Sequence, residues 1–199
     1  IFCKEYRRMN MFLEMGFDIN TKNKDGYNIL NFFFNEYIKY ESFNNIFDMT
    51  IDLSNKKTFN ELLKLDIDFN SKTYNGKTCL MSCVEQNNLD VFNKMIELNK
   101  YDINMEDDFG MTVLSHACFV KDIDIRIINK LLNMGSKTDF LNKFKESLLH
   151  IALKTNKSIE VIELIGKKCI RYINNEDIYG YTPITTYGCC LNEKKENYI

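Results

Sequence analysis

Several features are rare or absent in this sequence, and each absence excludes a class of protein. The 199 residues include no tryptophan, one proline and two histidines, and Lys plus Arg number 26 against 28 for Asp plus Glu. The formal net charge is -2, so the chain lacks the excess of basic residues that is typical of nucleic-acid-binding proteins. We therefore expect no nucleic-acid partner.

Long apolar runs are also absent. The segment Ile29–Phe34 is among the longest, and Asn31 interrupts it, whereas a membrane-spanning helix needs about 20 apolar residues. No signal-peptide pattern opens the sequence. We therefore expect a protein that neither acts at a membrane nor is exported.

The seven cysteines lack the spacing of a disulfide framework or a zinc site. Their number is odd, and no two of them form a Cys-x-x-Cys motif. Cys79 and Cys83 can share one face of a helix, but no histidine lies near them in sequence. We interpret both as small buried side chains, and we expect reduced thiols, no metal site and a cytoplasmic location.

Catalytic motifs are missing as well. The sequence has no glycine-rich phosphate-binding loop, no HExxH and no GxSxG. Cys118 and His116 are not expected to form a catalytic nucleophile pair, because side chains two residues apart point away from each other on a helix. The adjacent acids Glu106, Asp107 and Asp108 are typical of a solvated turn. We therefore expect no enzyme, no catalytic residue and no cofactor.

What the sequence does contain is an internal repeat. Five segments share the form Gly-x-Thr-apolar-Leu or a variant of it: Gly26–Leu30, Gly76–Leu80, Gly110–Leu114, Lys145–Leu149 and Gly180–Ile184. Ahead of each lies a second motif related to Asp-x-Asn: Asp18–Asn20, Asp68–Asn70, Asp102–Asn104, the degraded Lys137–Asp139, and Tyr172–Asn174. A fixed period indicates units that complete each other's hydrophobic core.

The third unit predicts two helices. Thr112 is a suitable N-cap, and the residues predicted to be buried in the first helix are Val113, Leu114, Ala117 and Cys118. After a break at 121–124, the second helix turns Ile127, Ile128, Leu131 and Leu132 inward. Gly135 can adopt the left-handed conformation that ends a helix.

Two helices and an extended turn, repeated at a period near 33, resemble the ankyrin-repeat family. The matching segments are Thr182–Pro183, His150–Ala152, and the second-helix endings in Met11–Asn20 and Lys130–Gly135. The resemblance implies an all-α ankyrin-repeat solenoid of paired antiparallel helices with short β-hairpin-like turns. It also places His150 at a buried position where it bonds to backbone between units. The sequence departs from the family pattern at Lys145, Asp66 and Asn99, which stand in place of glycines.

We expect one ankyrin-repeat domain over residues 1–199. Its parts are a partial unit 1–25, a long unit 26–75, units 76–109, 110–144 and 145–179, and a partial unit 180–199. The long unit carries an insertion near 42–53 with apolar residues at helical spacing. This insertion either covers a gap between units or offers a platform to a partner.

In this family the turn tips and the first helices form a concave protein-binding face, so the resemblance implies a protein-protein interaction module. The candidate partner-binding residues flank the turn glycines: Tyr74, Lys77, Asp108, Phe109, Met111, Lys143, Phe144, Glu146, Tyr179 and Tyr181. Aromatic residues and methionine are favoured in interface cores. Local packing within the turn is the alternative for Phe109, Phe144 and Tyr179.

Divergent arrays of this composition are similar to those of poxviruses and of some intracellular bacteria. The viral resemblance implies a host-modulating protein, or a ubiquitin-ligase substrate adaptor, that binds a host or cellular protein in the cytosol and is monomeric alone. The alternative is the targeting domain of a larger bacterial effector enzyme whose catalytic part lies outside this chain. We also expect the chain to be a portion of a longer protein.

Overall fold

The computed structural model describes residues 11, 13–31, 60, 63–155 and 157–196. Within these ranges the regular elements are helices, and no strand is present. The elements are α4 (Cys79–Glu85), α5 (Leu89–Glu97), α6 (Val113–Phe119), α7 (Ile125–Asn133), α8 (Leu148–Lys154), α9 (Ile159–Lys168), the 3-10 helix η1 (Ile170–Tyr172) and α10 (Pro183–Glu196). The all-α expectation is therefore confirmed for the described residues. The predicted insertion at 42–53 and residues 1–10 and 12 of the first partial unit lie outside them.

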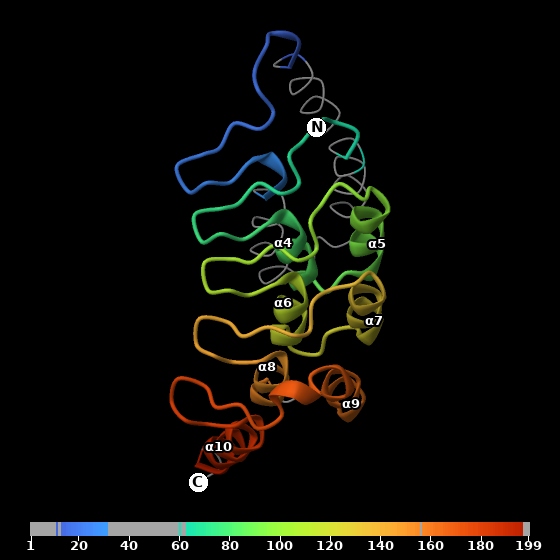
Figure 1. The fold of residues 1–199 in the computed structure, drawn as a ribbon. Coiled ribbons are helices and arrows are strands. Elements are labelled where there is room, and N and C mark those ends of the chain that lie inside the picture. Colours follow the sequence, from blue (N-terminus) through green and yellow to red (C-terminus); the bar gives the residue numbers. More distant parts are fainter. Residues whose placement is uncertain (1–10, 12, 32–59, 61–62, 156, 197–199) are drawn as a thin grey trace.

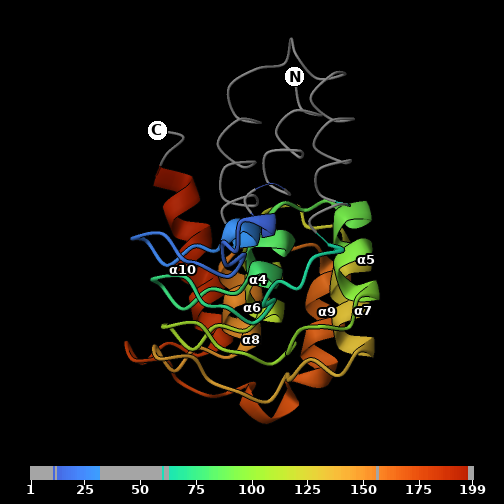
Figure 2. The ribbon, with the colours of Figure 1, turned by 90° about the horizontal axis from the view of Figure 1, so that it is seen from above.

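The helices stand in two columns (Figure 1). The first column contains α4, α6, α8 and α10, each in contact with the next, and the second contains α5, α7 and α9. Across the columns α4 packs on α5, α6 on α7 and α8 on α9. Seen from above, the extended turns project from the first column on the side away from the second (Figure 2). Helix pairs with their turns thus repeat along one direction.

The first helix of each pair begins with the same hydrogen-bonding device. Thr78, Thr112 and Ser147 are the N-caps of α4, α6 and α8, and each accepts a hydrogen bond from the backbone N–H three residues later. The side chain at that third residue in turn accepts from the N–H of the cap, which completes a reciprocal capping box. The prediction of Thr112 as an N-cap is confirmed.

Helix α6 shows how the repeat builds the core. Its four predicted core residues, Val113, Leu114, Ala117 and Cys118, are all buried. In α7, Ile127, Ile128 and Leu131 are buried and Leu132 is half-buried. Gly135 follows with a φ of 84°, so the predicted end of this helix is also confirmed. Because neighbouring first helices contact each other, the buried side chains form one continuous cluster along the molecule.

The extended turns share one hydrogen-bond pattern. In each turn the residue three positions before the turn glycine, or before Lys145 in its place, donates its backbone N–H to the carbonyl oxygen of the residue after that position, at 2.9–3.0 Å. Its side-chain oxygen accepts from backbone N–H groups in the same turn. The residues at this position are Asn23, Thr73, Asp107, Asn142 and Asp177. The turns are hairpin-like in this sense, although none contains a strand.

Hydrogen bonds also join each turn to the next unit. Asp108 donates its N–H to the carbonyl of Asn75 at 3.1 Å, and Lys143 donates to that of Phe109 at 2.9 Å. The Asp-x-Asn motif provides a second connection, since Asn70 Oδ1 accepts from the N–H of Asp102 at 2.7 Å. Asn104 Oδ1 accepts from Lys137 in the same way at 2.8 Å. The second sequence motif therefore recurs because its asparagine links adjacent units.

Helix α10 is longer than the other helices of the first column. It runs from Pro183 to Glu196 and has 14 residues. Leu191 is followed by Asn192 and then by a run of Glu and Lys. Glu and Lys have high helix propensity. They extend the helix beyond the length of α4, α6 and α8.

Candidate binding site

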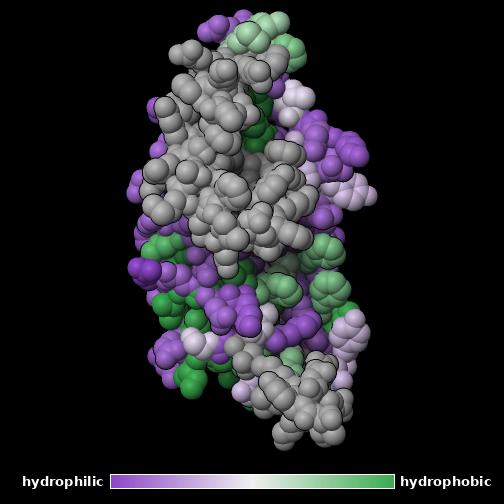
Figure 3. All heavy atoms as spheres, turned by 180° about the vertical axis from the view of Figure 1, so that it is seen from behind, coloured by the Kyte–Doolittle hydropathy of each residue, from purple (hydrophilic) through white to green (hydrophobic). Residues whose placement is uncertain are grey.

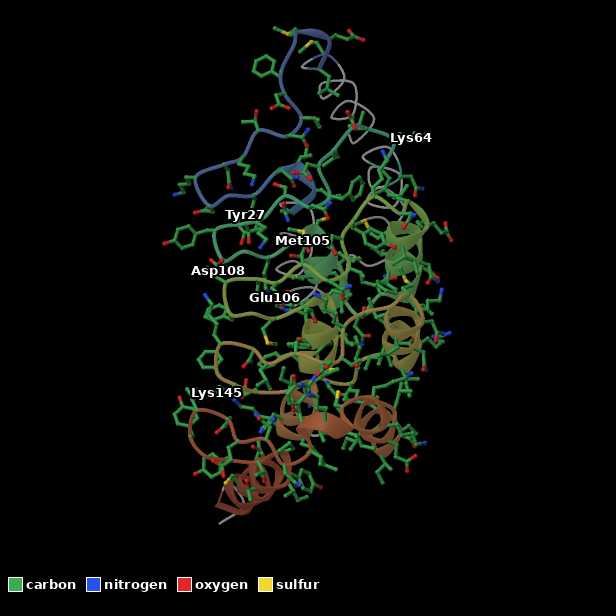
Figure 4. The ribbon with its side chains drawn as sticks, in the orientation of Figure 1. Tyr27, Lys64, Met105, Glu106, Asp108 and Lys145 are labelled. Carbon is green, nitrogen blue, oxygen red and sulfur yellow. The ribbon has the colours of Figure 1, made fainter. Side chains whose placement is uncertain are left out.

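The candidate site is a row of large side chains along the turns. We call it the aromatic strip and define it as Tyr74, Phe109, Met111, Phe144, Tyr179 and Tyr181. Tyr74 is 81% exposed, Tyr179 74%, Phe109 48%, Tyr181 44% and Phe144 39%, and Met111 is half-buried. Figure 4 shows Asp108 and Lys145, which neighbour these residues in sequence, at the projecting ends of the turns.

Two rings of the strip pack against each other. Phe109 and Phe144 hold the same position in consecutive units, and their ring centroids lie 6.3 Å apart with an interplanar angle of 15°. This stacking explains why both are less exposed than Tyr74 and Tyr179, and it gives part support to the alternative of local packing. The two phenylalanines offer a paired surface, whereas the two tyrosines expose most of their rings.

The charged candidates fall into two groups. Asp108 and Lys143 are exposed. Lys77 and Glu146 are only partly exposed and pair within the protein: Lys77 Nζ lies 2.6 Å from Glu85 Oε1, and Glu146 Oε1 lies 3.1 Å from Lys154 Nζ. A partner would therefore meet Lys77 and Glu146 in fixed positions.

A charged cluster lies beside the Phe109–Met111 turn, buried at His116 and Asp107 and half-buried at Glu85 and Lys77, and we call it the His116 cluster. It comprises His116, Asp107, Glu85 and Lys77. His116 Nδ1 lies 2.8 Å from Glu85 Oε1, and Nε2 lies 3.0 Å from Asp107 Oδ2. The other oxygen of Asp107 accepts the N–H groups of Phe109 and Met111, both at 2.8 Å.

Sequence reasoning missed this cluster, and its expectation for Asp107 is wrong. Asp107 is 7% exposed, whereas Glu106 and Asp108 on either side are exposed as expected. Asp107 holds the position three before the turn glycine, where the side chain bonds to its own turn. The signal in the sequence is the recurrence of Asn, Thr or Asp at this position in all five units.

The electrostatics favour the charged forms of the His116 cluster. Burial by itself lowers the pKa of His116, but hydrogen bonds to Asp107 and Glu85 outweigh it and raise the pKa above the ordinary 6.5. Burial likewise raises the pKa values of Glu85 and Asp107, yet the hydrogen bonds from His116 bring both below their ordinary values. Both ring nitrogens are engaged, so this histidine serves as a bridge between units.

The second histidine behaves as the resemblance implies. His150 is fully buried, and its Nδ1 accepts the backbone N–H of Ser147 at 3.1 Å. The ring proton therefore lies on Nε2, which donates to the carbonyl of Tyr181 in the next unit at 3.0 Å. The expectation of a buried histidine bonded to backbone between units is confirmed, and the bond also fixes the main chain of a strip residue.

The thiols of Cys79, Cys83, Cys118 and Cys169 are buried in the core, whereas Cys189 is exposed and Cys190 is half-buried. Cys79 and Cys83 are buried, as predicted. Burial raises the pKa of Cys79 to about 12 and raises that of Cys83 as well, which leaves both as unreactive thiols at neutral pH. In the part of the chain that the structure describes, no three potential metal-binding side chains come together.

Exposed apolar side chains are not confined to the strip. Ile159, Ile170 and Ile184 are exposed elsewhere, as is Phe119 at the end of α6. Seen from behind, the described surface mixes hydrophilic and hydrophobic residues (Figure 3). What distinguishes the strip is the recurrence of rings at equivalent positions. Among the described helices, none has the length and apolar character needed to cross a membrane.

Comparison with known proteins supports an ankyrin-like family. The chain is 35% identical over 123 residues to a putative ankyrin repeat protein of Fowlpox virus (strain NVSL). The match covers 62% of this chain but 28% of the fowlpox protein, so the chain spans less than a third of that relative's length. No family model matches the chain. The fowlpox similarity agrees with the repeated helix pairs and indicates a protein-interaction module in general.

Proposed function

We propose that this chain is part of an ankyrin-repeat solenoid that binds a protein through the aromatic strip and the charged residues beside it. The observation that carries the proposal is the recurrence of exposed rings at one position of successive turns, with Phe109, Phe144 and Tyr179 each directly before a turn residue of positive φ. Rings gathered in a row on the surface of one molecule are typical of an interface.

The turns suit this role because they are held rigidly. Each turn is closed by hydrogen bonds of its own and is joined to the next turn by a further one. A partner that docks on them orders little additional backbone, which lowers the entropic cost of binding. Tyr74 and Tyr179 serve as the free anchors, and the Phe109–Phe144 pair as a preformed apolar surface.

The charged residues have a different part in binding. Asp108 and Lys143 are exposed at the edge of the strip and would act mainly on the association rate and on the orientation of the partner. Lys77 and Glu146 are already paired with Glu85 and Lys154. They offer fixed charges next to Tyr74 and Phe144.

The fowlpox similarity suggests the kind of partner. A viral protein of this type would bind a host protein in the host cytosol and either sequester it or present it to a ubiquitin ligase as a substrate adaptor. The ligase-recruiting part of an adaptor would have to be supplied by sequence outside the described units.

Capture followed by a titration tests the proposal. The 199-residue chain is used as bait in host-cell lysate, a captured protein is identified by mass spectrometry, and its affinity is measured for Phe144→Ala, Tyr179→Ala and Tyr181→Ala. Truncation of an interface anchor costs about 2 kcal/mol or more, so we expect each variant to bind about 30-fold or more weakly.

Two variants serve as controls. Phe119→Ala removes a ring that is exposed to a similar degree at the far end of α6. Lys64→Ala changes an exposed residue on the opposite side of the molecule from the turn tips (Figure 4). If the strip variants fold and bind as tightly as these controls, the strip is not the binding surface.

A further inference from the structure

His116 bridges two carboxylates that belong to different elements. Glu85 is the last residue of α4, and Asp107 lies in the extended turn that precedes α6. The two ring nitrogens are 2.8 and 3.0 Å from the carboxylate oxygens. A neutral imidazole carries one N–H, so only the protonated ring donates to both carboxylates. The bridge is therefore complete only when His116 is charged.

Both carboxylates also hold residues of the proposed binding surface. Asp107 Oδ1 accepts the N–H groups of Phe109 and Met111, and Glu85 accepts from Lys77 Nζ at 2.6 and 2.8 Å. A single carboxylate thus separates the imidazole ring from each of three candidate partner-binding residues, Phe109, Met111 and Lys77. The next unit does not combine these groups, because Ile151 holds the position of His116 in its first helix and Asn142 that of Asp107.

We propose that protonation of His116 sets the position of the Phe109–Met111 turn relative to the preceding unit and so makes the binding surface sensitive to pH. This regulation rests on the proposed function only in its last step, the effect on partner binding. The coupling of His116 to the turn can be measured without a partner.

The other ionisable groups on neighbouring helices are occupied elsewhere. Helix α6 packs against α4, α7 and α8. On α8, His150 bonds to Ser147 and Tyr181, and Lys154 pairs with Glu146. On α7, Arg126 pairs with Asp124, and Lys130 Nζ donates to Asn93. The charges that face the ring are therefore Glu85, Asp107 and Lys77, with Lys77 opposing protonation and the two carboxylates favouring it.

The direction of the pH effect follows from the raised pKa of His116. A raised pKa stabilises the folded chain below the ordinary value of 6.5, and the contribution is lost as the pH rises through the folded-state pKa. Once the ring is neutral, one carboxylate faces a nitrogen lone pair. The Glu85 side chain is 24% exposed and that of Asp107 2%, and Glu85 keeps Lys77 as a partner. The link to Glu85 is therefore the one that opens.

The next turn provides an internal control. Asn142 Oδ1 accepts the N–H groups of Phe144 and Glu146, both at 2.9 Å, in the manner of Asp107. Its Nδ2 donates to Glu146 Oε2 at 2.8 Å and takes the place of a bridge to histidine. This turn has the same hydrogen bonds without the imidazole. It contacts the Phe109–Met111 turn only through the Lys143–Phe109 backbone hydrogen bond, the stacked rings and Asn142 Nδ2 on Met111 Sδ, so its amides should report the titration of His116 much more weakly.

The test is an NMR titration of the 15N-labelled 199-residue chain between pH 5 and 9. We expect the imidazole of His116, assigned with a His116→Gln variant, to titrate with a midpoint above 6.5, because two carboxylates favour its charged form. The amide signals of Phe109 and Met111 should move with the same midpoint. Those of Phe144 and Glu146 should move much less.

The Asp107→Asn variant completes the test. Asn142 shows that asparagine supports the turn, and loss of one carboxylate should lower the His116 midpoint by about one pH unit or more. The proposal is overturned if the Phe109 and Met111 amides do not follow His116, or if they follow it equally in Asp107→Asn. The two proposals can fail separately. If the amides follow His116 but the strip variants leave partner affinity unchanged, the coupling stands and the proposed binding surface is refuted.

Discussion

Single residues in this repeat carry backbone constraints that differ from turn to turn. At Gly76 an added Cβ would lie 2.6 Å from the backbone nitrogen of Asp108, so the close approach of the next turn requires glycine there. The equivalent Lys145 has a φ of 56° and already carries a Cβ. The constraint at Lys145 is therefore conformational, since the left-handed backbone conformation costs residues other than glycine about 1–2 kcal/mol.

We predict that Lys145→Gly increases the free energy of unfolding by about 1 kcal/mol. Glycine removes the cost of the left-handed backbone in the folded state, and this gain exceeds the loss from the greater chain entropy of glycine in the unfolded state. Equilibrium urea unfolding measures the change. The control is Lys143→Gly in the same turn, which has no positive φ to relieve and should lower stability by roughly 0.5–1 kcal/mol. Equal effects of the two substitutions would contradict the prediction.

At the scale of the element, the first helices depend on their ends. Helices α4, α6 and α8 have seven residues each, a length that is not stable alone in water. Their stability comes from packing between units and from the capping boxes. The cap of α8 has an additional role, because Ser147 Oγ also lies 2.8 Å from Nδ1 of His150, which fixes the ring that reaches Tyr181.

We expect Ser147→Ala to lower the free energy of unfolding by about 1 kcal/mol, the usual cost of losing a serine cap. Ser158 at the start of α9 is a matched control, since its side chain makes no capping hydrogen bond. Ser158→Ala should change stability by less than about 0.5 kcal/mol. Urea unfolding with unchanged m-values compares the two, and similar losses would show that the capping bond of α8 contributes nothing specific.

The same local rules determine what the sequence predicts. The cap at Thr112, the core face of α6 and the end of α7 before Gly135 depend on neighbouring residues, and the periodic pattern was enough to predict them. The position of His150 followed from the family resemblance. These elements account for most of the described repeat.

The His116 cluster could not be predicted in this way. Glu85 lies 31 positions before His116 in sequence, and the two meet only because α4 and α6 pack side by side. Asp107 was misread because a run of three acids is usually solvated, while its burial follows from the geometry of the turn. The stacking of Phe109 on Phe144 likewise depends on the distance between consecutive turns, which a sequence pattern does not give.

At the scale of the whole molecule, the position of a unit in the row decides how much each of its residues contributes to the stability of the fold. Leu80, Leu114, Leu149 and Ile184 hold the same place, the second residue of the first helix in four consecutive units. The first three are exposed by 5% or less, whereas Ile184 is 66% exposed. In a one-dimensional array each unit is stabilised by its immediate neighbours. In the described structure no further helix pair covers the outer face of α10.

Truncation of Leu114 and of Ile184 should therefore have very different effects on the stability of the 199-residue chain. Leu114→Ala should lower the free energy of unfolding by about 2–5 kcal/mol, because it removes a fully buried side chain between two packed helices. Ile184→Ala should cost less than about 0.5 kcal/mol, since the side chain is mostly in contact with water. Urea unfolding at two protein concentrations measures both. A large and concentration-dependent loss for Ile184→Ala would mean that a second copy of the chain covers this face in solution, in which case the stabilising neighbour of the last unit is another molecule.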